Sequence, residues 1–400
     1  MLLIELNKTN NQIIDEHFLN LCCDLYTESH LLGGQSIADE KLSNLDITNY
    51  SKKRNNVLPK KARGASNLSP YIRHGLLNLI DVWNRVENFD YEDKNKFRDE
   101  LLWQEFSRHI YAIIGKKSRN ELNFHLSTDN NFNFDTTNKM NCISNIKNEL
   151  EKTGYIVNQT RMWFASHYGL RDQKYWNLHE DYMFKHLLDG SRFANRLGWH
   201  WVMGSQTGKL YGFAKNQVLN RANELCNNCD LKYNCPIESW PNTVSIDIIE
   251  QNFDLDSRKN FGPDTTLTDT DLEPDYVWLT GESLGDNDPA LKFYDNLPVI
   301  FVFDEKLLKS IKISTKRINF LLQTLKELNE KKELFVYIGD PIEILKDKKI
   351  AVTFAPVPKY KYLSQNIKPL VEFPAVRLVK PIDFYPSSYS SWKKQAKLTI

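Results

Sequence analysis

The sequence predicts a two-part protein, with an all-helical region over residues 1–240 and a small α/β domain with a parallel sheet over residues 276–400. In the first region, apolar residues recur every three to four positions and alternating Val-rich runs are scarce. In the second region, short apolar runs alternate with a helix pattern, which is typical of parallel strands joined by right-handed crossovers. The polar stretch 241–275 between them is predicted to be a linker.

Individual elements follow from the same patterns. Helices are predicted over 76–86, 94–114, 143–152, 181–197, 213–225 and 314–329. Strands are predicted over 276–280, 297–303, 334–338 and 350–354. Residues 120–138 are rich in Asn, Asp and Thr, so we expect a long loop there.

Composition narrows the functional classes only slightly. The 52 basic and 51 acidic residues leave a net charge of +1, so nucleic-acid binding would need a local basic face. No stretch approaches the ~18 apolar residues of a membrane span, and the first residues do not read as a signal peptide. We therefore expect a cytoplasmic protein with no membrane contact, and a monomer.

The cysteine spacing is the strongest signal in the residues themselves. Cys226 and Cys229 form a Cys-x2-Cys pair, and Cys235-Pro236 follows six residues later. Such a run places three thiolates around one metal centre, and Cys142 is the candidate fourth ligand. Spacing alone does not separate zinc from an iron–sulfur cluster.

Several motifs in one order resemble the photolyase/cryptochrome family. They are Ser66-Asn67-Leu68-Ser69-Pro70-Tyr71, Glu100 to His109 with Trp103, Asn158-Gln-Thr-Arg161-Met162, Leu188-Asp189-Gly190, and Ala194-Asn195 leading to Gly198-Trp199-His200-Trp201. The resemblance covers most of residues 31–240. It implies that the first region is a helical FAD-binding domain and that the α/β domain is the Rossmann-like, antenna-type domain of that family.

The resemblance also implies the residues that bind FAD. These are Tyr50, Ser66, Asn67, Leu68, Ser69, Arg161, Asp189 and Asn195. Hydroxyls at a helix start suit the pyrophosphate, because free backbone N–H groups favour an anion there. Arg161 and Asp189 would form an ion pair beside the isoalloxazine ring, and Asn195 would face its N5 atom. The alternatives are an ordinary helix N-cap and a structural ion pair.

A second set implied by the resemblance concerns damaged DNA. Glu100 and Trp103 lie three residues apart on one helix face and would contact a flipped-out lesion, together with Asn158 and Met162. Arg54 resembles a DNA-facing arginine. The enzymes that repair (6-4) photoproducts carry paired histidines where this chain has Val157 and Asn158, so the pattern favours cyclobutane pyrimidine dimers.

Redox groups complete the resemblance. Trp199 and Trp176 match two members of the family's tryptophan electron-transfer chain, and residues 120–138 lack the third tryptophan. The cysteine region resembles iron–sulfur bacterial cryptochromes and photolyases, which implies a [4Fe–4S] cluster held by Cys142, Cys226, Cys229 and Cys235. The α/β domain follows the flavin domain rather than preceding it, which indicates a circular permutation. Its sequence does not predict whether it binds an antenna chromophore.

The sequence thus predicts light-driven repair of pyrimidine dimers by electron transfer from excited reduced FAD, the activity of a deoxyribodipyrimidine photo-lyase. DNA binding would involve a basic rim with eight candidates: Arg54, Lys60, Lys61, Arg63, Lys116, Lys117, Arg171 and Lys174. The alternatives are a cryptochrome-type photoreceptor without repair activity, and a zinc- or cluster-bearing DNA-binding protein without flavin.

Overall fold

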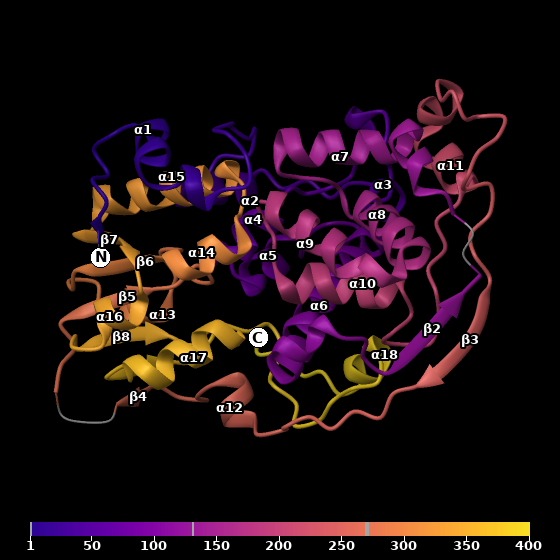
Figure 1. Ribbon diagram of the computed structural model, residues 1–400. Coiled ribbons are helices and arrows are strands. Elements are labelled where there is room, and N and C mark those ends of the chain that lie inside the picture. Colours follow the sequence, from indigo (N-terminus) through magenta and orange to yellow (C-terminus); the bar gives the residue numbers. More distant parts are fainter. Residues whose placement is uncertain (1, 130–131, 269–271) are drawn as a thin grey trace.

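The computed structural model describes residues 2–129, 132–268 and 272–400. A twisted sheet covered by helices lies beside a larger body of helices, and the chain passes between the two more than once (Figure 1). Residues 130–131 of the predicted loop and 269–271 of the predicted linker lie outside the described residues. No helix in the described part is long and apolar enough to cross a membrane.

Within the described residues, seven strands form the main sheet in the order β1-β7-β6-β5-β8-β9-β4. The strands are β1 (Leu2–Leu3), β4 (Leu267–Thr268), β5 (Tyr276–Leu279), β6 (Val299–Asp304), β7 (Leu334–Gly339), β8 (Ile350–Thr353) and β9 (Val371–Phe373). The five central strands are parallel, and β1 and β4 are antiparallel edges. The four predicted strands are therefore confirmed, together with their parallel arrangement.

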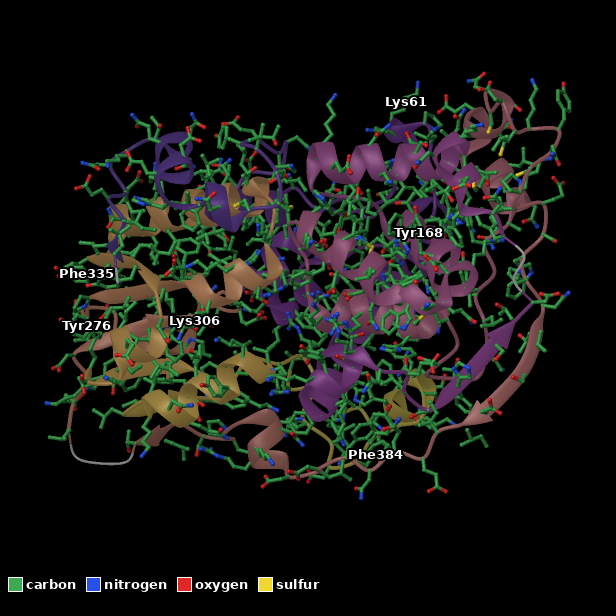
Figure 2. The ribbon with its side chains drawn as sticks, in the orientation of Figure 1. Lys61, Tyr168, Tyr276, Lys306, Phe335 and Phe384 are labelled. Atoms are coloured by element: carbon green, nitrogen blue, oxygen red, sulfur yellow. The ribbon has the colours of Figure 1, made fainter. Side chains whose placement is uncertain are left out.

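Side-chain alternation places a core on each face of this sheet. On β6, Val299, Phe301 and Phe303 belong to the large core shared with the helical body, whereas Ile300 packs in a smaller core on the other face. The flanking helices are α13 (Pro289–Phe293), α14 (Glu305–Ile311), α15 (Thr315–Lys331), α16 (Pro341–Leu345) and α17 (Pro358–Ile367). Near the amino ends of β5 and β7, the rings of Tyr276 and Phe335 lie 6.4 Å apart (Figure 2).

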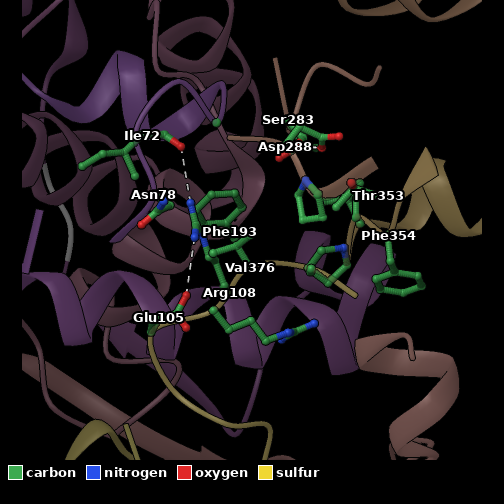
Figure 3. Close-up of a pocket in the computed structure, with 18 of the residues that line it drawn as sticks. Ile72, Asn78, Glu105, Arg108, Phe193, Ser283, Asp288, Thr353, Phe354 and Val376 are labelled. Atoms are coloured by element: carbon green, nitrogen blue, oxygen red, sulfur yellow. Dashed lines mark hydrogen bonds and ion pairs between the residues drawn. The ribbon is translucent and has the colours of Figure 1, made fainter. Parts of the chain in front are cut away.

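The direction of strand addition reverses between β5 and β8, and sheets of this type bind ligands outside the carboxyl ends of the strands at such a point. A cavity of about 100 Å³ lies there, between the sheet and the helical body. Figure 3 shows Ser283 and Thr353 on one wall and Glu105 and Arg108 on the other. Its volume is below the ~300–1,000 Å³ that is typical of small-molecule sites.

The helical body is built around α6 and α8. Its helices are α2 (Gln35–Ser43), α3 (Tyr50–Lys53), α4 (Ser69–Arg73), α5 (Leu79–Arg85), α6 (Tyr91–Ile114), α7 (Asn141–Thr153), α8 (Asn158–Arg171), α9 (Trp176–His186), α10 (Leu197–Val202) and α11 (Lys215–Asn227). Nearly every α8 side chain after Met162 is buried, including Trp163 at 0% exposure. A helix buried on all sides must be surrounded by other helices, which makes α8 the centre of this body.

The helix predicted over 181–197 is wrong as a single helix. α9 ends at His186, and a π-helix begins at Arg192 and ends at Arg196. Between them, Leu188 donates its N–H to the Gly154 carbonyl, and a Cβ on Gly190 would lie 2.6 Å from an Arg317 nitrogen. The backbone there is held by contacts with residues that are distant in sequence. Apolar residues that recur every three to four positions cannot reveal such contacts.

Regions predicted to be irregular contain structure. The predicted loop 120–138 contains β2 (Phe124–Thr128), and the predicted linker 241–275 contains β3 (Thr243–Ile248), β4 and α12 (Ser257–Phe261). β2 and β3 pair as an antiparallel ribbon that curves along the outside of the helical body (Figure 1). All six β3 side chains are exposed, so this strand lacks the alternating burial on which the prediction relied.

The chain ends also cross the predicted division at residues 240 and 276. At the N-terminal end, β1 pairs with β7, and α1 (Asn10–His17) packs on α15. Near the C-terminal end, α18 (Tyr389–Lys393) packs on α6 of the helical body. The helical body and the sheet are thus each completed by a segment from the opposite end of the sequence.

We expect the protein to lose stability as the pH falls from about 6.5 toward about 4, in part through His200. Burial lowers the pKa of this fully enclosed imidazole from 6.5 to about 4. In that window the unfolded chain binds a proton that the folded chain does not, so acid favours unfolding. Urea midpoints measured across this range should fall less steeply for His200→Gln than for the unmodified protein. The same change at the surface-lying His125 is the control, and equal slopes for all three proteins would contradict the prediction.

Candidate functional site

The helical body contains a cavity of about 450 Å³, within the volume range of small-molecule sites. It lies between α6, α8, the π-helix and α10. Its lining residues are Arg54, Ser69, Arg73, Lys96, Glu100, Trp103, Gln104, Phe106, Ser107, Asn158, Arg161, Met162, Asp189, Ser191, Ala194, Leu197, Gly198, Trp201 and Gln206. Eight residues singled out in the sequence meet here: Arg54, Ser69, Glu100, Trp103, Asn158, Arg161, Met162 and Asp189.

The remaining candidates lie outside the immediate lining. They are Tyr50, Ser66, Asn67, Leu68, Asn195, Trp176 and Trp199. Tyr50 packs edge-on against Phe97 at 5.0 Å, and Leu68 is buried in the core. The N-cap of α4 is Leu68, whose side chain accepts no capping bond, so neither serine caps this helix as an ordinary N-cap would.

Arg161 and Asp189 form the predicted ion pair, with 2.9 Å between Arg161 Nη2 and Asp189 Oδ2. Arg161 Nε also donates to the Ile156 carbonyl at 2.9 Å, which fixes the guanidinium plane. The second carboxylate oxygen, Asp189 Oδ1, is buried and has no hydrogen-bond partner among the described residues. A buried carboxylate oxygen without a donor is costly, so the wall of the cavity offers an acceptor to a ligand that carries an N–H or O–H group.

Asn195 sits in the π-helix, a local geometry that is frequent at functional sites. Its Oδ1 accepts the Ser191 N–H at 2.7 Å, and Ser191 Oγ accepts the Ala194 N–H at 3.2 Å. The Asn195 carbonyl is thereby committed to the backbone, which orients the amide and leaves its NH₂ group as the donor for a neighbour.

The opposite wall carries Glu100 and Trp103, one turn apart on α6. Glu100 Oε1 lies 2.9 Å from Arg54 Nη1 and 3.3 Å from Lys96 Nζ. One face of the Trp103 ring is covered by Tyr389, whose ring lies nearly parallel to it at a centroid distance of 3.9 Å. A base can therefore stack only on the other face. Sequence reasoning missed Tyr389, because only the folded chain brings α18 against α6.

Tyr389 is itself held in place. Its hydroxyl donates to Asp99 Oδ1 at 2.5 Å, and Lys393 Nζ lies 2.5 Å from the same oxygen. The ring of Trp201 approaches Trp103 from another side at 6.4 Å. Trp103 is thus positioned by α18 and α10 as well as by its own helix.

The two tryptophans predicted for electron transfer are neighbours. The rings of Trp176 and Trp199 lie 6.3 Å apart, and Trp199 is only 1% exposed. Phe132 and Phe134, from the segment without the third tryptophan, pack against His167. No tryptophan from residues 120–138 can continue the chain, as the sequence already indicated.

The four predicted cysteine ligands line one small cavity of about 20 Å³. Cys142 lies at the start of α7, Cys226 lies near the end of α11, and Cys229 and Cys235 follow in the next turns. Burial, followed by the charges of Cys235 and Cys226, raises the pKa of the Cys142 thiol to about 12. This cause shows that the four thiols are electrostatic neighbours, although Cys142 is distant in sequence from the other three.

The predicted basic rim is only partly available for DNA. Arg171 is 2% exposed and donates to the carbonyls of Phe213 and Ser239. Arg63 and Lys60 both pair with Glu149, at 2.7 and 3.3 Å. Lys61 lies at the outer surface (Figure 2). Arg54 is the rim candidate that lines the large cavity.

Sequence comparison relates the chain to known proteins. It is 28% identical over 152 residues to the deoxyribodipyrimidine photo-lyase of Vibrio cholerae, and 27% identical over 187 residues to that of Thermus thermophilus. The chain is similar to deoxyribodipyrimidine photo-lyases. These matches cover 34% and 44% of this chain and only 32% and 42% of those photo-lyases.

No family model matches the chain. Among solved structures, a Synechocystis sp. PCC6803 cryptochrome aligns with a TM-score of 0.42 and 18% identity, over 50% of this chain and 47% of the other. A bacterial class III photolyase from Agrobacterium tumefaciens aligns with a TM-score of 0.40 and 22% identity, over 48% of this chain and 43% of the other.

Proposed function

We propose that the protein is a member of the photolyase/cryptochrome family that repairs cyclobutane pyrimidine dimers in DNA with light, as a deoxyribodipyrimidine photo-lyase (a carbon–carbon lyase). One observation supports this most. The Arg161–Asp189 pair, with its unsatisfied buried oxygen, and the Glu100–Trp103 pair line the same 450 Å³ cavity. The residues that we assign to the cofactor and those that we assign to base recognition therefore border the same space.

The residues present fit FAD. Asp189 Oδ1 offers an acceptor to a ring N–H or a hydroxyl, and Arg161 supplies a fixed positive charge beside it. Ser69 lines the cavity at the start of α4, with Ser66, Asn67 and Leu68 just before it and Tyr50 nearby, and we assign this end to the phosphates. The bound, reduced flavin would supply the light-absorbing electron donor.

The chain's own residues then have defined roles. Trp103 offers its uncovered face to a flipped-out dimer, and Glu100 accepts hydrogen bonds from the base edge once Arg54 turns toward a phosphate. Asn158 and Met162, at the start of α8, border the same space. Asn195 donates its NH₂ toward the cofactor ring, and the buried Trp199–Trp176 pair is the proposed route for electrons that keep the cofactor reduced.

We also propose a [4Fe–4S] cluster at Cys142, Cys226, Cys229 and Cys235. No three of these four sulfur atoms all lie within 4.8 Å of one another. Within the described residues, the group of His, Cys, Asp or Glu side chains that meets this limit does not include these cysteines. The four sulfur atoms thus line one cavity but are spread more widely than a single zinc ion requires, since Zn–S bonds of ~2.3 Å bring sulfurs closer together. The wider spacing favours a cluster over zinc.

The order of the two parts supports a circular permutation relative to the family. The helices that carry the cavity precede β5, the first parallel strand, in the sequence. The crevice between the α/β domain and the helical body, at about 100 Å³, is below the usual volume of small-molecule sites, and we propose a structural role for that domain.

Trp103→Ala should weaken binding to dimer-containing DNA by about ten- to a hundredfold while leaving flavin content unchanged. Stacking on an aromatic ring contributes ~1–3 kcal/mol per base, and this substitution removes the ring face that we assign to the lesion. Fluorescence anisotropy with a dimer-containing and an undamaged oligonucleotide measures the effect. Trp240→Ala, which removes a partly exposed tryptophan outside the cavity, is the control. Equal affinity of both variants for the dimer would overturn the assignment of the lesion site.

A further inference from the structure

A second group of side chains that could bind a metal lies apart from the large cavity and from the four cysteines. Cys23 and Asp24 follow the short turn Leu19–Leu21, and His186 is the last residue of α9. One potential ligand atom from each of these three residues lies within 4.8 Å of the other two. None of the three lines the large cavity or the small cavity of Cys142, Cys226, Cys229 and Cys235, here called the cysteine quartet.

The backbone brings these residues together from distant segments. The Cys23 N–H donates to the Ile313 carbonyl at 3.3 Å, and the Ser314 N–H donates to the Lys185 carbonyl at 2.9 Å. The loop before α15 is therefore bonded on one side to the N-terminal segment and on the other to α9. The group lies where the sheet's α15 meets the helical body.

His186 provides an observation that points to a ligand. The residue is only 9% exposed, and its Nδ1 has no hydrogen-bond partner within the described residues. A buried imidazole nitrogen without a partner is unfavourable, and a metal ion that accepts its lone pair removes that cost. Its ring also packs edge-on against Tyr182 at 4.9 Å, which limits rotation away from the group.

Asp24 is oriented as a metal-binding carboxylate usually is. Its Oδ1 accepts the Thr315 N–H at 2.6 Å, and its Oδ2 accepts Lys316 Nζ at 2.8 Å. Each carboxylate oxygen has a second lone pair, so both bonds can persist while the group binds an ion, and such bonds hold ligands in place in known sites. Lys316 is 1% exposed and also donates to Thr27 Oγ1 at 3.4 Å.

The donor set selects the ion. A thiolate, an imidazole and a carboxylate are the ligands of zinc, and three protein ligands leave a fourth tetrahedral position for water. Hard cations such as Mg²⁺ and Ca²⁺ depend on several oxygen ligands and bind thiolates poorly, and this group offers one carboxylate. We propose that Cys23, Asp24 and His186 form a zinc site that ties the N-terminal segment to α9 and α15.

Zinc binding by the purified, cofactor-loaded protein tests this proposal. After equilibration with zinc alone, the metal content of the unmodified chain should exceed that of Cys23→Ser and of His186→Ala by about one zinc per chain. Loss of a ligand should weaken zinc binding by more than the ~10–100-fold that follows from losing a residue that only orients a ligand. Cys22→Ser is the matched control, because it removes the adjacent buried thiol that lies outside the group. Iron, counted in the same samples, should be equal in all four proteins.

Thermal unfolding gives a second readout. Zinc should raise the melting temperature of the unmodified protein and of Cys22→Ser but not that of Cys23→Ser or His186→Ala, since an ion that binds only the folded chain stabilises it. Zinc bound at the cysteine quartet instead would persist in Cys23→Ser. Equal zinc content and equal melting shifts in all four proteins would overturn the proposal, and Asp24 would then serve only as the counter-ion of Lys316. Failure of the unmodified protein to bind zinc would overturn it as well.

Discussion

Replacing Asp189 with alanine is expected to remove flavin from the purified protein and to abolish light-driven repair with it. The carboxylate is buried and lies 2.9 Å from Arg161, so the change leaves a largely buried guanidinium without its partner. Breaking such a pair from one side costs ~3–5 kcal/mol, which corresponds to roughly a hundredfold to a few thousandfold in an equilibrium constant. The same change removes Oδ1, the acceptor that we assign to the cofactor. Flavin per chain, measured by absorbance after desalting, gives the result.

The control is an ion pair of equal length on the surface. Asp286 lies 2.9 Å from Lys331, and both side chains are more than 40% exposed. Exposed pairs contribute ~0–1 kcal/mol, so Asp286→Ala should retain its flavin. Full flavin content in Asp189→Ala would show that the Arg161–Asp189 pair is a structural feature and that the cofactor binds elsewhere.

The second large effect concerns the cysteine quartet. Cys142→Ser should lower the iron content to near zero and destabilise the segment that carries Cys226, Cys229 and Cys235. Cys142 is the only one of the four that comes from α7, so the cluster would join this helix to the end of α11. Metal-binding free energy of this kind is also folding free energy. Iron content together with limited proteolysis of residues 226–240 measures both consequences.

Cys22→Ser controls for the loss of a buried thiol, because Cys22 is 7% exposed and lies outside the quartet. It should keep its iron. If Cys142→Ser also kept its iron, the fourth ligand would have to be another residue. If the unmodified protein bound zinc at the quartet in place of iron, the proposed cluster would be wrong.

The sequence predicted the parts of the fold that depend on local pattern. The runs that became β5, β6, β7 and β8 are apolar, and burial on both faces of a parallel sheet leaves that signature. It did not predict β1 or β4, which have two residues each, or the exposed β3. Strands of this kind form because a partner strand is available to pair with them, and the local sequence pattern does not show which segment that partner is.

In the candidate site, too, the features set by local sequence were predictable and those set by distant contacts were not. Glu100 with Trp103 and Asn158 with Met162 are three and four residues apart on helices, so the motifs that contain them already place each pair on one face. The structure then added that both faces, together with Arg161 and Asp189, border one cavity. Tyr389 and the unsatisfied Asp189 oxygen could not be predicted, because each depends on contacts between segments far apart in the chain.

One measurement tests the central claim most directly. The protein is purified without oxygen, its absorption spectrum is recorded, and it is then illuminated with an oligonucleotide that contains a pyrimidine dimer. We expect a flavin spectrum over a broad iron–sulfur shoulder at about 400 nm, and loss of dimers in the light but not in the dark. Flavin without any loss of dimers would contradict repair and favour the photoreceptor alternative, and a protein without flavin would contradict the account of the cavity itself.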